Sequence, residues 1–158
     1  MTRQNRNNMT IEDLLDAWRV NNVVTLELLD GCTDDDFELK PGKGKTIRSN
    51  FVHIIGVRKM WLDDKVRQQV ESALKLDWKT ATRDEICSGL ELTADLMAQL
   101  FAKKEGSTKT SKLSTIKFFA YCIAHEANHR AQIEISLRIN GREPDDAFLY
   151  DLWEWGKK

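Results

Sequence analysis

Three histidines have the strongest potential for chemistry in this sequence. The chain contains only three, and two of them are four residues apart. His125 and His129 would lie one turn apart on one helix face, with Cβ atoms about 6 Å apart, so that both imidazoles can bind one metal ion. His53 falls on the inward stripe of another predicted helix. The sequence therefore predicts a metal site formed by His53, His125 and His129, with coordination positions left open to water or substrate.

The residues between the two paired histidines allow other interpretations. Residues 125–129 read H-E-A-N-H, which matches the H-E-x-x-H motif and makes Glu126 a candidate general base. That motif needs a third ligand downstream, where no histidine follows and Glu154 is the candidate. Zinc peptidases place the motif helix beside a sheet, whereas no strand is predicted here. The E-x-x-H half of a di-iron carboxylate site is also present, but its partner position carries Asn50 instead of a glutamate.

Three further side chains are candidates for roles around the histidines. Cys122 precedes His125 by one turn, and as a thiolate it would be a fourth ligand that closes the site. The alternative is a small buried hydrophobic residue. Asn22 and Asn50 lie on inward stripes, where they could hold the outer nitrogens of the ligating histidines or be ordinary buried amides.

Four amphipathic helices must position these residues. They are predicted from Thr10 to Gly31, from Thr46 to about Gln69, from Thr82 onward, and from about Ser114 to Asn140. Capping boxes are expected at Thr10 with Asp13 and at Thr82 with Glu85. The inward stripe of the second helix is predicted to be Asn50, His53, Val57, Met60, Trp61 and Asp64. These lengths and patterns are typical of a four-helix bundle.

Three glycines and the C-terminal tail add detail to this all-α interpretation. Gly141 is placed to adopt the left-handed conformation that ends a helix. Gly56 and Gly89 lie inside helices, where each should allow close packing or leave room for a ligand. The apolar tail, residues 148–155, is expected to dock onto the bundle or onto a second subunit.

Composition limits the classes of protein that the chain can belong to. Its 158 residues fit one domain, which we place at residues 10–158 after a flexible N-terminus at 1–9. A formal net charge of -1 argues against a dedicated nucleic-acid-binding protein. No apolar run is long enough to span a membrane and no signal peptide is evident, so we expect a cytoplasmic protein. The three cysteines do not indicate a disulfide scaffold.

Two segments resemble a known family. The string H-E-A-N-H-R-A-Q-I at 125–133, followed by R-I-N-G-R-E-P, and the stretch K-P-G-K-G-K-T-I-R-S-N-F-V-H-I-I at 40–55 are similar to those of the DinB/YfiT-like family. The resemblance implies an up-down-down-up four-helix bundle and frequent homodimers. It also implies that His53, His125 and His129 bind a divalent metal, often nickel or zinc, and that a low-molecular-weight thiol is a cosubstrate.

Our leading hypothesis is a divalent-metal-binding protein that acts as a metalloenzyme on a small-molecule substrate. The metal would activate a thiol or water for transfer or isomerisation. Nickel and zinc are the first candidates and iron is a further one, because imidazole suits all three. Two alternatives are a metal-dependent hydrolase with Glu126 as base and a non-catalytic, metal-stabilised interaction module.

Overall fold

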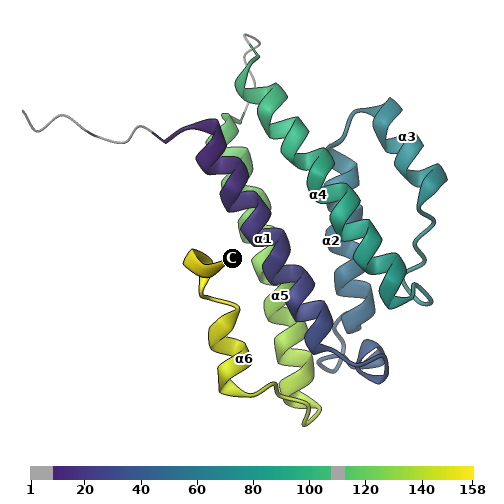
Figure 1. Cartoon of the computed structure of the whole chain (residues 1–158). Coiled ribbons are helices and arrows are strands. Elements are labelled where there is room, and N and C mark those ends of the chain that lie inside the picture. The colour runs from purple at the N-terminus through teal and green to yellow at the C-terminus, as the bar shows by residue number, and fades with distance from the viewer. Residues whose placement is uncertain (1–8, 108–112) are drawn as a thin grey trace, which may run out of the picture.

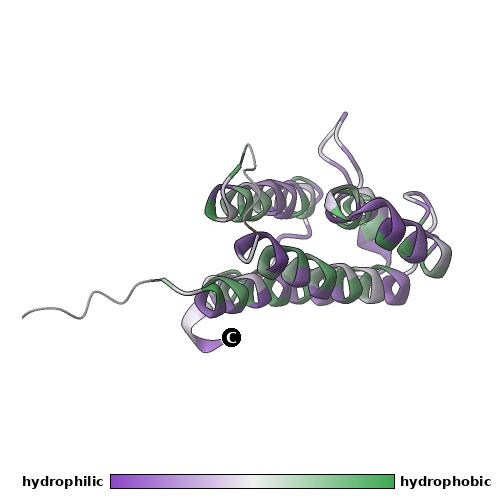
Figure 2. Ribbon diagram, turned by 90° about the horizontal axis from the view of Figure 1, so that it is seen from above, coloured by the Kyte–Doolittle hydropathy of each residue, from purple (hydrophilic) through white to green (hydrophobic). Residues whose placement is uncertain are grey.

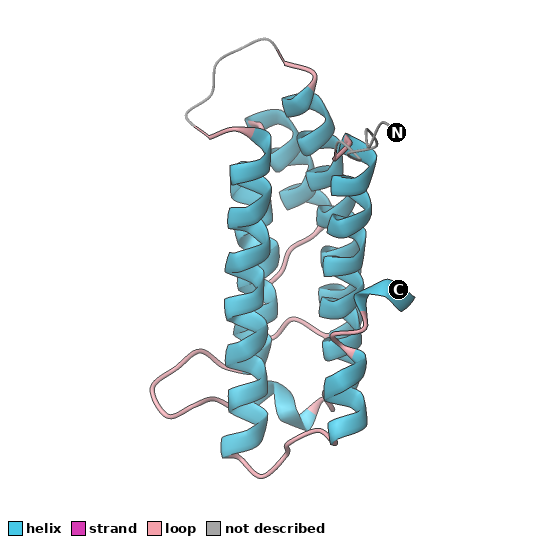
Figure 3. Ribbon diagram, turned by 90° about the vertical axis from the view of Figure 1, so that its left-hand side faces the viewer, coloured by secondary structure: helices cyan, strands magenta, loops and turns pink. Residues whose placement is uncertain are grey.

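All regular secondary structure in the residues that the structure describes is helical. The structure is a computed structural model and describes residues 9–107 and 113–158. Its helices are α1 (Ile11–Gly31), α2 (Ile47–Trp61), α3 (Asp64–Ala73), α4 (Arg83–Glu105), α5 (Thr115–Ile139) and α6 (Asp146–Asp151), with 3₁₀ helices η1 (Asp35–Glu38) and η2 (Trp155–Lys157). No strand occurs in these ranges (Figure 3). The predicted all-α class is confirmed. Of the predicted flexible N-terminus, residues 1–9, all but the last residue lie outside the described part.

The four long helices pack along their lengths (Figure 1). α1 contacts α4 and α5, and α2 contacts the same two helices, while the shorter α3 lies against α2. Hydrophobic and hydrophilic residues both occur around each long helix in Figure 2, as expected where one face packs and the other meets solvent. Across the described ranges, none of the helices has both the length and the apolar character needed to cross a membrane.

The predicted helix starts are confirmed by their capping hydrogen bonds. Thr10 and Asp13 form a capping box at the start of α1, and Thr82 and Glu85 form another at the start of α4. Each satisfies backbone N–H groups that have no partner within the helix. At the other end of the last long helix, Gly141 adopts a φ of +71°, as the left-handed C-terminal position requires.

The predicted second helix is wrong in its length. It was expected to continue to about Gln69, but α2 ends at Trp61 and a separate helix, α3, begins at Asp64. The side chain of Asp63 accepts a hydrogen bond from the backbone N–H of Val66 and so caps the new helix. Leu62 is buried at this break, which lets the chain change direction while its apolar side chain stays in the core.

The predicted inward stripe of this segment is also partly wrong. Met60 is 55% exposed and Asp64 is exposed. The face of α2 that packs on the other helices instead carries Ile47, Asn50, Phe51, Ile54, Ile55 and Arg58. His53 lies at the edge of this buried face and is half-buried. This position leaves its imidazole between the core and the solvent.

Two apolar clusters form the core. One contains Leu28, Phe51, Ile54, Leu90 and Ile133 among its buried residues, and the other contains Trp18, Leu62, Phe101, Phe118 and Cys122. Gly89 allows α4 to approach α2 closely, because a Cβ at this position would lie 2.9 Å from Cδ1 of Ile55 on α2. Buried polar residues lie between the two clusters along α1, α2 and α5, and they belong to the site described below.

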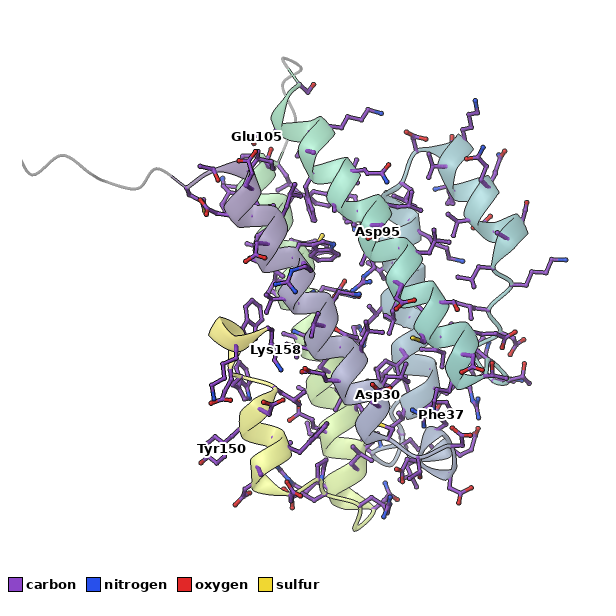
Figure 4. The ribbon with its side chains drawn as sticks, viewed as in Figure 1. Asp30, Phe37, Asp95, Glu105, Tyr150 and Lys158 are labelled. Atoms are coloured by element: carbon purple, nitrogen blue, oxygen red, sulfur yellow. The ribbon has the colours of Figure 1, made fainter. Side chains whose placement is uncertain are left out.

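The C-terminal residues lie along α1 and α5. Leu152 is buried in the first apolar cluster, and Phe148 and Trp155 pack against it. Lys158 contacts α1 through an ion pair with Glu27, whereas Tyr150 points away from the helices and is 74% exposed (Figure 4). The tail therefore divides its aromatic side chains between the core and the surface.

Candidate metal centre

The three histidines come together between α2 and α5. His53 lies on α2, and His125 and His129 lie one turn apart on α5. Each offers one ligand nitrogen, and these three atoms lie within 4.8 Å of one another. The ring centroids of His53 and His129 are 4.5 Å apart, and those of His125 and His129 are 4.6 Å apart. A group of three imidazoles this close can hold one metal ion.

The surroundings of the histidines favour their neutral forms. Burial, followed by the nearby His53, His125 and Lys45, lowers the pKa of His129 to about 4. Burial is also the main cause of the lowered pKa of His53 and of His125. A neutral imidazole keeps a lone pair for a metal, whereas an imidazolium has none. At neutral pH all three side chains are therefore available as ligands.

Asn50 holds the most buried of the three rings. Its Oδ1 lies 2.9 Å from Nδ1 of His129, and its Nδ2 donates to the carbonyl oxygens of Thr46 and Lys45. Because Nδ2 is engaged by two acceptors, the atom that faces His129 is the oxygen, and Nδ1 of His129 must carry the proton. This leaves the lone pair on Nε2 of His129. Asn50 thus fixes both the orientation and the tautomer of a ring that faces the other histidines.

An aromatic pair, Tyr121 and Trp61, lies beside His125 on the side away from the α2 N-terminus. The Tyr121 ring stacks on His125 with centroids 6.1 Å apart, and its edge contacts Trp61 at 5.7 Å. Sequence reasoning missed Tyr121, although it precedes His125 by four residues and so shares its helix face. Tyr121 therefore covers one face of the His125 ring, and Trp61 packs on Tyr121.

The side chain of Glu126, the predicted candidate for a general base, is turned away from the histidines. Its carboxylate is 2% exposed and forms a bidentate ion pair with Arg58, with Oε1 2.7 Å from Nε and Oε2 2.8 Å from Nη2. Nδ2 of Asn21 donates a third hydrogen bond to Oε2 at 2.7 Å. His125 lies beside His53 of α2 and Ala127 lines a hollow with Leu152 of the C-terminal tail, whereas Glu126 points into the core. A carboxylate with these three contacts is not placed to accept a proton from a substrate at the histidines.

Arg58 is a central residue that sequence reasoning missed. Besides the pair with Glu126, it donates to Asn22 Oδ1 and to the carbonyl oxygen of Leu90, both at 2.8 Å, and its guanidinium lies 5.0 Å from the Trp18 ring centroid. Asn22, a candidate for holding a histidine, therefore contacts Arg58 instead. The spacing of Arg58 after Phe51 and Ile54 would have indicated a buried position. The cluster of Arg58, Glu126, Asn21 and Asn22, called the buried ion-pair cluster below, connects α1, α2 and α5.

Comparison with protein families agrees with this arrangement. The sequence model of the DinB family matches residues 1–155. The chain belongs to the DinB family. This family is associated with metals, and the histidine triad of this DinB-family chain is consistent with that association. A search of curated proteins finds no match.

Cys122 lies outside the histidine triad of this DinB-family chain. Its side chain is 5% exposed and packs in the second apolar cluster with Trp18 and Phe118. Burial, reinforced by the charge of Glu126, raises the pKa of the Cys122 thiol to about 12. The thiolate that a fourth ligand requires is therefore disfavoured at neutral pH. The described residues bring no thiol or carboxylate into the histidine group.

Proposed function

We propose that this DinB-family chain is a metal-dependent enzyme in which His53, His125 and His129 hold one divalent transition metal. The observation that carries the proposal is the convergence of three imidazole nitrogens, from two helices, within 4.8 Å. Glu126 and Cys122 are engaged elsewhere, so three protein ligands leave positions for water or substrate, as in catalytic sites. Nickel and zinc are our first candidates, with iron as a further one.

The donor set fits such a metal. Each of the three pKa values is lowered, so the imidazoles are neutral at the pH where metal is bound. Asn50 accepts the Nδ1 proton of His129, a contact that orients metal-binding histidines in other proteins. When bound, a divalent metal supplies Lewis acidity that lowers the pKa of a thiol or a water molecule.

We propose a thiol-dependent transfer or isomerisation as the reaction, on the basis of the family resemblance. A low-molecular-weight thiol would enter from the solvent side, because His53 and His125 are half-buried at the edge of the helices. The apolar surface of Tyr121 and Trp61 would exclude water on one side of the reacting sulfur. Glu126 is held by Arg58, and no other carboxylate of residues 9–107 and 113–158 joins the histidine group, which favours this reaction over hydrolysis assisted by Glu126.

The first test is the metal content of protein purified without a histidine tag. We expect about one transition metal per chain in the wild type and none in His53→Ala. The matched control is Asn128→Ala, which changes an exposed residue of α5 and should leave the metal content unchanged. Circular dichroism establishes that both variants are helical. If a reconstituted wild type and His53→Ala retain the same amount of metal, the proposed site is wrong.

The second test concerns the reaction. Wild type and His125→Ala are compared with several low-molecular-weight thiols and electrophilic substrates, with and without added metal. Conjugation or isomerisation that needs the thiol, the metal and His125 supports the proposal. Turnover of esters or amides without a thiol would replace it with a metal-dependent hydrolase. If the metal-loaded wild type is inactive in every combination while its metal position exchanges no ligand, a metal-stabilised module replaces the enzyme.

We also propose an organisation for the whole chain. The chain directions of α1, α2, α4 and α5 in Figure 1 support an up-down-down-up four-helix bundle within a single domain, residues 10–158. The burial of Leu152 supports docking of the tail onto its own bundle. The family resemblance supports a homodimer, which light scattering on the purified protein would test. A monomer at all concentrations would contradict the homodimer without affecting the metal site.

A further inference from the structure

A cleft of about 610 Å³ lies beside His53. Its walls come from the loop before α2, from residues 49–56 of α2 and from Trp78 in the connection between α3 and α4. Small-molecule sites commonly have volumes of about 300–1,000 Å³. The cleft is thus large enough for a small organic molecule, and it shares a histidine with the candidate metal centre.

The charge in this cleft is positive. Lys40, Lys43 and Lys45 line it, and none of the described residues that line it is acidic. Within the described ranges, no carboxylate forms an ion pair with any of these three lysines, unlike Arg48 close by, which pairs with Glu38. The first turn of α2, which carries no acidic residue, also borders the cleft. The backbone N–H groups of Ile47 and Ser49 are bonded to Leu39 O and Thr46 Oγ1, so the contribution of the helix there is the positive end of its dipole.

The backbone of Lys45 and the side chain of His53 connect this cleft to the histidine triad. Nδ2 of Asn50 donates to the carbonyl oxygen of Lys45, and Oδ1 of the same side chain contacts Nδ1 of His129. His53 lies on the wall of the cleft and within the histidine triad. A molecule bound by the lysines would therefore have its other end close to the three imidazoles.

The wall of α2 and Trp78 provide apolar surface. Val52 is half-buried in the wall, and the Trp78 ring, 55% exposed, lies over the cleft. A Cβ built at Gly56, which also lines it, meets no atom within 4 Å. Gly56 is thus the helix glycine that leaves open space, in contrast to Gly89, which allows close packing.

We propose that this cleft binds the anionic group of the substrate, a carboxylate or a phosphate, through Lys43 and Lys45. The inference rests on the proposed function, since the reactive part of that molecule would then lie at the histidines. The apolar wall would contact the carbon skeleton next to the anionic group. The substrate class is accordingly a small organic anion.

Binding of simple anions tests the cleft without knowledge of the substrate. Inorganic phosphate, succinate and phenyl phosphate are titrated into the full-length protein, as purified and after metal removal, while NMR follows the amides of residues 40–56. We expect Lys43→Ala/Lys45→Ala to weaken phosphate and succinate binding about tenfold, as for the loss of two charge-assisted contacts. Binding that persists after metal removal assigns the site to the protein and not to the ion.

A matched variant separates this site from a general effect of charge. Lys65→Ala/Lys117→Ala removes the same two charges from exposed positions outside the cleft. We expect it to change binding by less than about twofold, because distant surface charges are screened by salt. Equal weakening in the two double variants, or no weakening in either, would overturn the proposal.

Two further variants test the apolar wall. Trp78→Ala should remove the tighter binding of phenyl phosphate relative to inorganic phosphate, and Gly56→Met should block phenyl phosphate by filling the open space. The Gly56 change also replaces glycine with a better helix former, so loss of binding through unfolding is not expected. If phenyl phosphate binds no more tightly than phosphate in the wild type, the proposed contact with the carbon skeleton is wrong.

Metal analysis distinguishes failure of this inference from failure of the proposed function. The Lys43→Ala/Lys45→Ala variant keeps all three histidines and should keep the wild-type metal content. A full metal content without any effect of these lysines on anion binding overturns the cleft alone. If the wild type takes up no metal even after reconstitution, but its anion binding still depends on the two lysines, the cleft is supported as an anion site and the metal centre is contradicted.

Discussion

Two polar clusters connect α2 to α5, and they differ in how completely their hydrogen-bonding groups are used. In the buried ion-pair cluster, Arg58 and Glu126 are each 2% exposed and almost every polar atom has a partner. In the histidine cluster, Asn50 orients His129, while one nitrogen from each of the three rings lies within 4.8 Å of the other two. The first arrangement is suited to holding two helices in register, and the second is suited to binding an ion.

The contrast follows from adjacent positions on the same helices. Glu126 lies directly after His125 in the sequence, yet the helix turns its side chain into the core. The ion pair with Arg58 therefore fixes the rotation of α5 relative to α2. That rotation determines where the two α5 histidines lie relative to His53. One cluster is a structural support for the other.

The largest effect is expected from breaking the ion pair. Glu126→Ala leaves the Arg58 guanidinium buried without its counter-charge, which should lower the free energy of unfolding by about 3–5 kcal/mol. Urea unfolding of the metal-free protein measures this. The control is Asp16→Ala, which breaks the exposed pair with Arg19 and should cost no more than about 1 kcal/mol. Equal costs for the two variants would show that the buried pair does not support the fold.

A smaller effect should separate the two clusters by function. Asn50→Leu removes the acceptor for Nδ1 of His129, so we expect metal affinity to fall about 10–100-fold, as measured by competition with a chelator. The matched control is Asn22→Leu, because Asn22 is also buried but contacts Arg58. Asn22→Leu should lower stability and leave metal affinity unchanged. A similar loss of metal affinity in both variants would contradict the separation.

Much of the fold was predictable because its signals are local. Thr10 and Thr82 mark helix starts through residues three positions away. The end of α2 was missed because Leu62 and Asp63 interrupt the helix without a glycine or proline. Asp is a common N-cap residue, but the spacing of apolar residues in the sequence continues past Asp63. Local spacing alone does not show that the chain turns there.

The candidate site was predictable only in part, because only some of its contacts join residues that are close together in the sequence. The spacing of His125 and His129 is visible within a single turn. The role of Arg58 depends on Glu126, 68 residues away, and an arginine is seldom fully buried unless it is paired. The histidines could therefore be predicted from the sequence, whereas the ion pair that orients them required the tertiary structure.

The histidine cluster should also make the stability of the protein depend on pH. The pKa of His129 is lowered to about 4 in the folded state, from about 6.5 for an unperturbed histidine. Between these pH values the unfolded chain binds more protons than the folded one. The stability contributed by the neutral histidines is therefore present above about pH 6.5 and is lost as the pH falls toward about 4.

Urea unfolding of the metal-free protein measures this loss. The range from about pH 7.5 to about pH 4 includes the ordinary histidine pKa of about 6.5. The control is the triple variant His53→Gln/His125→Gln/His129→Gln, which keeps the buried ion-pair cluster and all carboxylates. Its stability should fall less over this range, so that the difference between the two proteins increases with pH. A difference that is independent of pH would show that the histidines are not held in their neutral forms.

The smallest effect is expected at Cys122. This residue lies on α5 close to both the histidine cluster and the buried ion-pair cluster, and it belongs to neither. Its thiol packs among apolar side chains, and its raised pKa keeps it protonated at neutral pH. Cys122→Ala should therefore lower the free energy of unfolding by about 1 kcal/mol, an ordinary cost for a buried substitution. Elemental analysis should find the wild-type metal content, because the three imidazoles are unchanged. A loss of metal as large as in His53→Ala would make Cys122 a fourth ligand and would close the site that we propose to be open.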